Sequence, residues 1–442
     1  MFKRRIDLRG LVRFRRGEFV SNVRRLLGAT ATGQLIGVAL VPIVSRIFAP
    51  SEFGLATSVL AVANTLSTFS SLRYQQAIII AEDQGEAETV LRLAVLIALL
   101  LTAVELLAVL ISQGLFADSI SEWLQGQAGL LYAAPIVGLL TGLTLVLKAW
   151  QIRSKGFRRI GGAAIVVGAS VPLTRISLGL SAGATAGALI AGTGLGLVAQ
   201  IAVLGTAKLR AACRGTLAEI RSGRLWSTAR QYRDFPLFSA PEALLHNVSN
   251  TLPIYVLGFI YEPAVVGFYV MATRLVRLPV DALSQSVRQV YFQKSTELKS
   301  RGRDEISAFF KITGVLFVAG LIPFTVLGLY AEDLFRLFLG DRWGTAGAYT
   351  SVLVMWIFAG FVAVPSQVVF VTYRQQARWL RFQIALLLLR VGVFVVGYLL
   401  GIEALPLIAL FAVTGGLFNV FIMFIAYGII IQGRDHDVSR SA

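Results

Sequence analysis

Long apolar runs separated by short polar segments fill the chain from about residue 26 to residue 431. Runs such as LRLAVLIALLLTAVELLAVLI can cross a hydrocarbon core of about 30 Å as a helix, which takes roughly 20 residues. The pattern predicts twelve such spans, over residues 26–48, 54–80, 90–112, 129–149, 160–180, 184–206, 236–260, 265–292, 306–329, 346–371, 379–400 and 405–431. We therefore expect an all-α polytopic membrane protein with twelve transmembrane helices.

Composition agrees with this pattern. The 442 residues are 56% apolar and 15% charged, with a mean hydropathy of +0.73. Soluble proteins carry about 25% charged residues. The protein is therefore expected to be an integral membrane protein.

Positive charge is distributed unevenly between the two predicted sides of the membrane. The net charge is +17, yet toward the predicted outer side the only basic residues are Arg46, at the outer end of the first span, and Arg336 and Arg342 in an outer loop. The other basic residues outside the spans lie in the tails and inner loops, as the positive-inside rule requires of cytoplasmic segments. We expect both termini in the cytoplasm, and the charge to serve topology and contact with anionic lipids rather than nucleic acid. Residues 1–25 are predicted to be a retained basic tail, because they do not resemble a signal peptide.

A short motif occurs once in each half of the chain. RIFAPSEFGLA contains Pro50 and Gly54, and FIYEPAVVGFYVMA contains Pro263 and Gly267, which lie 213 residues later. Six spans, a long basic loop and six further spans indicate a duplicated transporter. The predicted domains are a six-helix N-lobe over 26–206, a cytoplasmic basic linker over 207–235, a pseudo-symmetric six-helix C-lobe over 236–431 and a cytoplasmic tail over 432–442.

The linker itself shows helical periodicity. Leu209, Cys213, Leu217 and Ile220 recur at helical spacing, which predicts a short amphipathic helix on the inner leaflet. Two roles remain open for it: a tether between the lobes, or a grip on a lipid head group.

The eighth predicted span carries a row of charged and polar residues. Arg274, Arg277, Asp281, Gln285 and Arg288 fall within an arc of about 80° on a regular helix. A charge at the bilayer centre costs about 2.5–3.5 kcal/mol on insertion scales, so this row is expected to face a hydrated cavity. Asp281, four residues after Arg277, can neutralise one arginine, which leaves the row with a net charge of +2. Buried polar pairs that hold helices together are the alternative interpretation.

The second span carries a matching but neutral row. Asn64, Thr68 and Gln75 lie 213 residues before Arg277, Asp281 and Arg288, so they are their equivalents in the first repeat. Ser67 and Ser71 lie on the same face of the predicted helix. We expect the two faces to line one central cavity between the lobes.

Other intramembrane polar residues have two interpretations each. Glu242 and His246, with Asn250 nearby, are predicted to be either a proton-sensitive coupling pair or a structural contact. Arg46 either faces the mouth of the cavity or extends to the outer interface. Arg73 lies opposite the polar row, so span 2 either loses helical regularity there or, as we expect, Arg73 extends toward the cytoplasm. Arg175 and Arg390 occupy near-equivalent repeat positions and are expected to form structural pairs.

Metal chemistry is not indicated. The chain has one cysteine, Cys213, and two distant histidines, so we expect no metal and no cofactor.

Three stretches resemble a known family of bacterial polysaccharide flippases. They are GQLIGVALVPIVSRIFAPSEFGLATSVLAV, GFYVMATRLVRLPVDALSQSVRQVYF and LFLGDRWGTAGAYTSVLVMW. The family belongs to the multidrug/oligosaccharidyl-lipid/polysaccharide exporter superfamily and contains O-antigen and exopolysaccharide repeat-unit translocases. The resemblance implies two six-helix lobes in a V shape, a bacterial inner-membrane location and cationic residues in a central lumen. By position, Arg46, Arg274 and Arg277 match those residues best.

The implied function is transport rather than catalysis. A flippase of this kind moves undecaprenyl-diphosphate-linked glycan repeat units to the outer leaflet by alternating access, for O-antigen, exopolysaccharide or capsule synthesis. A glycan polymerase and chain-length machinery are the partners expected beside the substrate. Energy coupling is left open between membrane potential, H⁺, Na⁺ and downstream polymerisation.

Two other functions are weighed against this one. A cation-coupled multidrug exporter of the same superfamily usually needs acidic residues in its N-lobe, and spans 1 and 2 contain none. A membrane glycan polymerase or ligase needs larger outer loops with a general base, and the longest outer loops here contain no histidine.

Overall fold

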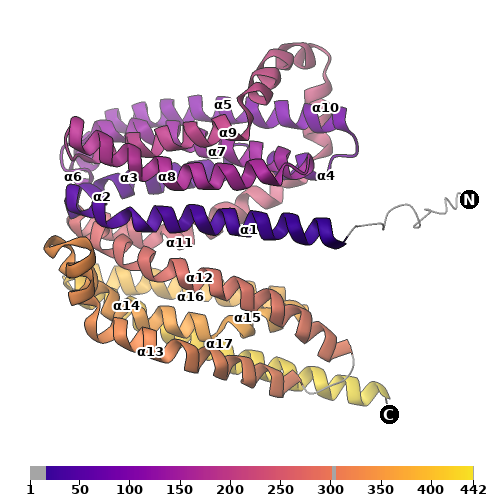
Figure 1. The fold of residues 1–442 in the computed structure, drawn as a ribbon, viewed down its shortest axis with the longest axis vertical. Helices are drawn as coiled ribbons and strands as arrows, with labels where there is room; N and C mark the ends of the chain where they lie inside the picture. Colours follow the sequence, from indigo (N-terminus) through magenta and orange to yellow (C-terminus); the bar gives the residue numbers. More distant parts are fainter. Residues whose placement is uncertain (1–15, 301–304, 442) are drawn as a thin grey trace, which may run out of the picture. The chain divides into compact units, whose positions relative to one another are not determined.

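The computed structural model describes residues 16–300 and 305–441, and within these ranges every regular element is a helix (Figure 1). Among the described residues, 11 helices are long and apolar enough to cross a membrane. A bent pair formed by α3 (Pro50–Phe69) and α4 (Tyr74–Ile80) brings the number to 12 if it is one span. The prediction of an all-helical protein with twelve spans is confirmed.

The chain divides into two compact units whose limits differ from the predicted lobes. The described residues up to Phe48 belong with Ser58–Thr251 to unit 1, and Ala49–Thr57 belongs with the described residues from Leu252 onward to unit 2. Of the three boundaries, one falls between α2 and α3, and the other two fall inside helices, α3 and α11 (Ala240–Ile260). None of them lies in the linker at 207–235. The first turns of α3 thus belong to the same unit as the second half of the chain.

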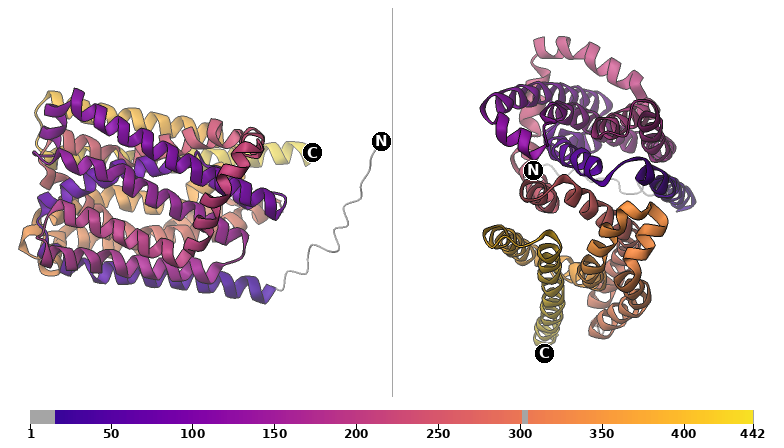
Figure 2. Two further views of the ribbon diagram at one scale, coloured as in Figure 1. Left: turned by 90° about the horizontal axis from the view of Figure 1, so that it is seen from above. Right: turned by 90° about the vertical axis from the view of Figure 1, so that its left-hand side faces the viewer.

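Unit 1 contains the helices of the first repeat and the linker. Besides most of α3, α4 and the first part of α11, these are α1 (Arg16–Ala39), α2 (Val41–Ile47), α5 (Gln84–Leu115), α6 (Ala117–Trp123), α7 (Ala133–Arg153), α8 (Phe157–Ser181), α9 (Ala186–Arg221) and α10 (Arg224–Gln231). Within α9 the backbone departs from helical geometry at Gly205, where φ is 131°. The residues after it and α10 turn away from the direction of the long helices (Figure 2).

Unit 2 contains the second repeat. Its helices are α12 (Pro263–Ser300), α13 (Glu305–Leu339), α14 (Gly344–Val362), α15 (Val364–Thr372), α16 (Gln376–Leu399) and α17 (Ala404–Ser441). α14 and α15 form one span interrupted at Ala363, because Pro365 in the first turn of α15 has no N–H to continue the helical ladder. α14 packs against α12, α13 and α17, which makes it the central helix of the unit.

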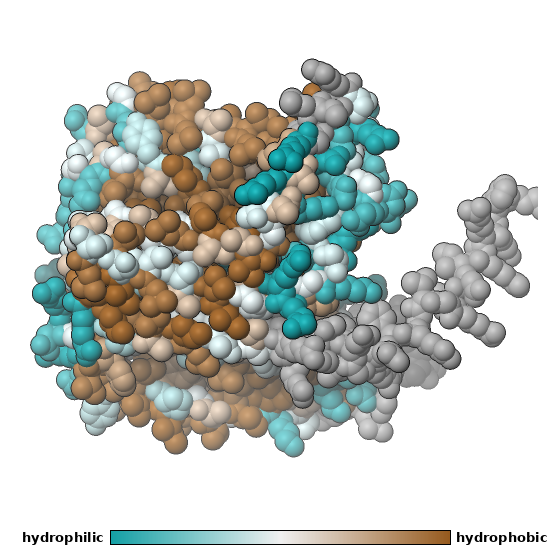
Figure 3. All heavy atoms as spheres, turned by 45° about the horizontal axis from the view of Figure 1, so that its top comes forward, coloured by the Kyte–Doolittle hydropathy of each residue, from teal (hydrophilic) through white to brown (hydrophobic). Residues whose placement is uncertain are grey.

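Apolar side chains remain exposed along the spans. Val104, Leu107 and Leu110 on α5 keep more than half of their surface accessible, as expected of helices that face lipid. On the face drawn in Figure 3, hydrophobic residues cover the middle and hydrophilic residues gather toward the two ends. The surface is that of a multi-pass membrane protein.

The second span is not a continuous helix. α3 ends at Phe69, and Leu72 and Arg73 adopt left-handed φ angles of 48° and 64° before α4 begins at Tyr74. α3 and α4 are bent by 45° relative to each other. The expectation that Arg73 extends from a regular helix is therefore wrong, and the alternative, a loss of helical regularity, is what the chain adopts.

The repeated proline–glycine motifs pack directly on each other within unit 2. A Cβ atom added at Gly54 would lie 1.6 Å from the carbonyl oxygen of Pro263, and one added at Gly267 would lie 2.1 Å from that of Pro50. Because neither glycine has a Cβ, the first turn of α12 packs on Gly54 at backbone contact distance, and the first turn of α3 packs on Gly267 in the same way. The contact explains why the motif occurs in both halves.

Buried aromatic rings lie beside this contact. Trp343 is fully buried, in an edge-to-face contact with Phe53 at 5.2 Å between ring centroids and with Phe268 at 6.1 Å. Phe53 belongs to α3 and Phe268 to α12. The tryptophan of the GDRW stretch therefore holds together one helix from each repeat.

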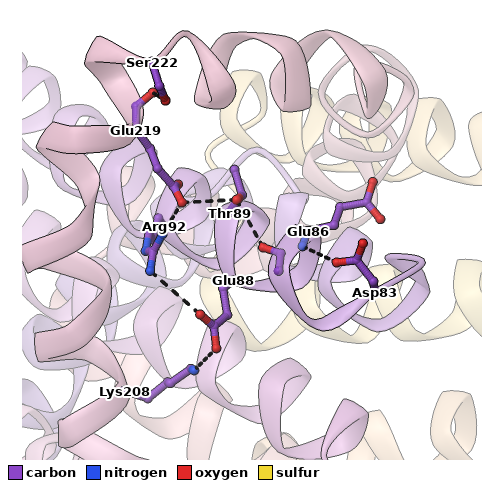
Figure 4. A network of polar contacts seen from close by, with 9 residues as sticks. Asp83, Glu86, Glu88, Thr89, Arg92, Lys208, Glu219 and Ser222 are labelled. Atoms are coloured by element: carbon purple, nitrogen blue, oxygen red, sulfur yellow. Dashed lines mark hydrogen bonds and ion pairs between the residues drawn. The ribbon is translucent and has the colours of Figure 1, made fainter.

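The linker is helical, as predicted, and is joined to α5 by charged side chains (Figure 4). Glu219, near the end of α9, forms an ion pair with Arg92 and accepts a hydrogen bond from Thr89 Oγ1 at 3.3 Å. Lys208 Nζ lies 2.8 Å from Glu88 Oε1. These contacts fix the end of α9 against the first turns of α5.

A second set of contacts fixes α10. Glu86 accepts hydrogen bonds from Gln231 at 2.7 Å and from the Tyr232 hydroxyl at 3.0 Å. Burial, and next the hydrogen bond to Glu86, raise the pKa of the Tyr232 phenol to about 12. Tyr74 of α4 donates to the carbonyl of Ala229 at 3.0 Å. The linker is therefore a packed part of unit 1.

The glycine contact predicts a stability difference between two alanine substitutions. Gly54→Ala places a Cβ where the Pro263 carbonyl lies, so we expect a loss of about 1–3 kcal/mol or more, as for overpacked cores. Gly314→Ala on α13, where no atom lies within 4 Å of the added Cβ, serves as the control. Thermal melting of both variants in detergent measures the effect, and equal melting temperatures would contradict the contact.

The ion pair of the linker predicts a change in proteolysis. Glu219→Gln removes the charge that Arg92 pairs with, and a local loss of about 1–2 kcal/mol raises the open population roughly 5–30-fold. Trypsin cleavage at exposed Arg214 is therefore expected to accelerate by a similar factor. Glu122→Gln on α6, an exposed carboxylate away from the linker, is the control. An unchanged cleavage rate in Glu219→Gln would show that the pair does not hold the linker.

Candidate functional site

The charged row predicted on the eighth span lies on one uninterrupted helix, α12, in unit 2. The side chains of Arg274, Asp281, Gln285 and Arg288 are exposed, and that of Arg277 is half-buried. Pro279 lies inside the helix without ending it. The row thus forms an accessible polar face on α12, while its position in a cavity between the lobes stays a prediction.

Two arginines from different helices lie against one tryptophan. The guanidinium carbon of Arg277 is 4.4 Å from the ring centroid of Trp356 on α14, and that of Arg390 on α16 is 5.0 Å from the same ring. Arg390 also lies 4.9 Å from the Phe411 ring of α17, which meets Trp356 edge to face at 5.2 Å. We call Arg277, Trp356, Arg390 and Phe411 the arginine–tryptophan cluster.

The positive charge of this cluster is not neutralised by the protein. Among the side chains that the structure describes, neither arginine has a carboxylate at ion-pair distance, and Nε of Arg390 is buried without a hydrogen-bond partner. Cation–π contacts contribute about 0.5–2 kcal/mol each but leave the charge in place. Two like charges on one ring repel each other, so an anion placed beside them would be attracted by both.

Asp281 does not neutralise Arg277 as predicted. Its carboxylate is exposed, and no ion pair joins it to Arg277 among the described residues. The spacing of four residues permits the pair, but the Arg277 side chain turns to Trp356 instead.

Arg175 and Arg390 are held differently, although the repeat makes them near-equivalent. Arg175 on α8 donates from Nε to the carbonyl of Leu189 at 3.2 Å and from a terminal nitrogen to Thr193 Oγ1 at 2.8 Å. Arg175 thus has the structural role expected of both, connecting α8 to α9. Arg390 contacts aromatic rings and belongs to the arginine–tryptophan cluster.

The neutral row of the second span is divided by the break after α3. Asn64 is exposed and Thr68 is half-buried, with its hydroxyl donating to the Asn64 carbonyl at 2.9 Å. Gln75 lies after the break, 6% exposed, and accepts a hydrogen bond from Ser71. Ser67 is also buried. The row is therefore accessible at Asn64 and partly at Thr68, whereas Ser67 in α3 and the residues after the break are buried.

The remaining predicted residues lie in unit 1. Arg46 is exposed near the end of α2, and Nε of Arg73 is buried without a hydrogen-bond partner. His246 pairs with Asn250, whose amide nitrogen lies 3.0 Å from His246 Nε2 and donates to the His246 carbonyl. No hydrogen bond or ion pair joins His246 to Glu242 among the described residues, so a coupling role for Glu242, His246 and Asn250 stays a prediction.

Sequence reasoning missed Trp356 and Phe411. Both are ordinary apolar residues of a span by pattern, and only the helix packing brings them to the arginines. The available signal was the excess of arginines over acids on the eighth and eleventh spans, because cations without an acidic partner need aromatic or polar neighbours.

Comparisons with solved structures show the fold. The lipid II flippase MurJ in an inward closed conformation matches with a TM-score of 0.65 and 9% identity, over 90% of this chain and 86% of that chain. An inward-facing multidrug resistance MATE family transporter of the MOP superfamily matches with a TM-score of 0.61 and 14% identity, over 93% and 95% of the two chains. A MOP superfamily transporter from Pyrococcus furiosus, whose binding pocket is described as having reverse polarity, matches with a TM-score of 0.56 and 15% identity. The match covers 95% of this chain and 96% of that chain.

Sequence comparison identifies the family. No curated protein sequence matches the chain. Residues 43–348, more than half of the chain, match the family described as "Polysaccharide biosynthesis protein". The resemblance noted in the sequence is confirmed. The chain belongs to the polysaccharide biosynthesis protein family and has the fold of transporters of the MOP superfamily.

Proposed function

We propose that this protein moves a lipid-linked glycan, with an undecaprenyl diphosphate carrier, from the cytoplasmic to the outer leaflet of the bacterial inner membrane. The observation that carries the proposal is the arginine–tryptophan cluster, whose two guanidinium groups have no carboxylate partner among the described residues. A diphosphate is the anion that best complements two arginines, because each guanidinium donates two parallel hydrogen bonds to phosphate oxygens.

The family supports a glycan substrate. The description of the family names polysaccharide biosynthesis, and a fold shared with transporters supports movement of a glycan-containing molecule across the membrane. The aromatic face of Trp356 adds a surface on which a sugar ring or an isoprene unit can stack.

The membrane potential favours the proposed direction. With the inside negative, outward movement of an anion gains about 2.3 kcal/mol per charge for every 100 mV. The diphosphate would pass by alternating access, with its polyprenyl chain in the bilayer. Coupling to H⁺ or Na⁺ and assembly with a glycan polymerase and chain-length machinery remain proposals.

Deleting the gene in the source organism tests the function. We expect loss of one surface polysaccharide and accumulation of its lipid-linked repeat unit, accessible from the cytoplasmic side only. Extraction of lipid-linked sugars, together with staining of surface polysaccharide, measures both. Normal surface polysaccharide without accumulated intermediate would contradict the proposal.

The cluster is tested by charge removal. Arg277→Ala and Arg390→Ala each remove a charged donor, worth about 1.5–3 kcal/mol, so we expect export to fall at least about tenfold while membrane insertion is retained. Lys311→Ala on α13 removes an exposed positive charge elsewhere in unit 2 and is expected to export normally. Wild-type export by both arginine variants would exclude the cluster from transport.

A further inference from the structure

A second site lies on α12, toward the end that the charge pattern places at the cytoplasmic side. A pocket of about 390 Å³ opens between α12, α15 and α16, all in unit 2. Its lining consists of one arginine, three glutamines and a set of apolar and aromatic residues: Arg288, Gln289, Phe292, Gln367, Val368, Phe370, Val371, Gln376 and Trp379. We call it the Arg288 pocket. The proposed transport mechanism does not use it.

The walls of the Arg288 pocket are held by buried polar contacts just beyond it. Ser295 of α12 donates to Glu305 and lies 3.2 Å from Thr372 Oγ1 at the end of α15. The Tyr373 hydroxyl donates to Glu305 Oε2 at 2.7 Å. These bonds fix α12 against the end of α15, so the pocket is preformed.

The floor of the pocket is apolar. Val368 and Phe370 are almost fully buried, and the Trp379 ring packs on Phe370 with 5.2 Å between centroids. Phe292 and Val371 are about half exposed at its edge. The volume lies in the range of roughly 300–1,000 Å³ typical of small-molecule pockets, which holds a few isoprene units rather than a whole polyprenyl chain.

The edge of the pocket is cationic. Arg288 is exposed, and among the described residues no carboxylate lies at ion-pair distance from it. Arg374, Arg378 and Arg381 lie in the turn before α16 and in its first turns, next to the lining residues Gln376 and Trp379. An apolar floor with an unpaired arginine beside it complements a molecule that has an apolar chain and an anionic end.

The position on α12 relates this pocket to the arginine–tryptophan cluster. Arg288 follows Arg277 by eleven residues, which is about 16 Å along a helix at 1.5 Å per residue. A substrate head group released from Arg288 would therefore reach the cluster by moving along one exposed polar face that contains Asp281 and Gln285.

We propose that the Arg288 pocket is a receiving site for the diphosphate end and first isoprene units of the lipid carrier, before the head group reaches the arginine–tryptophan cluster. The proposal rests on the proposed function and specifies the lipid part of its substrate. Arg288 binds the diphosphate, the glutamine amides donate to its oxygens, and Trp379 with Val371 and Phe292 contacts the isoprenoid. The site is specific because a ligand must present both an isoprenoid chain to the apolar floor and an anionic group to Arg288.

Binding of farnesyl diphosphate to the full-length protein in neutral phosphatidylcholine nanodiscs tests the proposal. Arg288→Ala removes the charge, and Val371→Trp fills the pocket from its exposed edge; each is expected to weaken binding at least about tenfold. Lys294→Ala, an exposed cation on the same helix outside the lining, is the matched control and is expected to bind like the wild type. Calorimetry measures affinity, and thermal melting of each variant verifies its fold.

Three competing ligands identify what the pocket recognises. Farnesol and inorganic diphosphate are each expected to bind at least about tenfold more weakly than farnesyl diphosphate, because each lacks one of the two recognised parts. If phosphatidylglycerol displaces farnesyl diphosphate at equal concentration, the pocket is a general groove for anionic lipids and the proposal is overturned.

The outcome separates this proposal from the proposed function. If Arg288→Ala and Val371→Trp bind like the wild type while Arg277→Ala does not, the receiving site is overturned and the transport function stands. If binding depends on Arg288 but deletion of the gene leaves surface polysaccharide unchanged, the site stands and the transport function fails.

Discussion

An arginine inside a membrane-spanning helix needs solvation that lipid cannot supply. Insertion of one such charge at the bilayer centre costs about 2.5–3.5 kcal/mol on insertion scales, so each side chain must find water, protein groups or a ligand. Arg175 finds a backbone carbonyl and a hydroxyl. Arg277 and Arg390 find aromatic rings, which stabilise a cation without neutralising it. This difference in contacts distinguishes Arg175, which has a structural role, from Arg277 and Arg390, which are suited to bind an anion.

Duplication gives the molecule two related sets of helices with different chemistry. The proline–glycine motifs of both repeats meet in one contact at backbone distance, and Trp343 packs beside it on a phenylalanine from each repeat. The helices that begin at this contact differ: α12 continues through five charged and polar residues, whereas α3 has only neutral polar groups after Glu52 in its first turn and ends at Phe69. Identical packing thus supports one cationic helix and one neutral helix.

Much of the fold follows from patterns that are local in sequence. Apolar run length gives the spans, because this signal depends on adjacent residues alone. The repeated motif marks Gly54 and Gly267 in the sequence, and the structure places both in a close helix contact. The break at Leu72 and Arg73 was the less favoured of two interpretations of Arg73, since neither residue favours left-handed φ angles and the apolar pattern continues across it. Trp356 could not be assigned from sequence, because its role depends on which helices α14 contacts. The Asp281 pair failed because aromatic contacts from another helix compete with the local spacing rule.

A structure of the protein bound to a polyprenyl diphosphate glycan would test the central claim most directly. The account predicts that, in at least one transport state, phosphate density lies within hydrogen-bonding distance of both Arg277 and Arg390, beside the Trp356 ring. Phosphate density elsewhere in every state, with the two arginines paired to carboxylates of the protein, would contradict it.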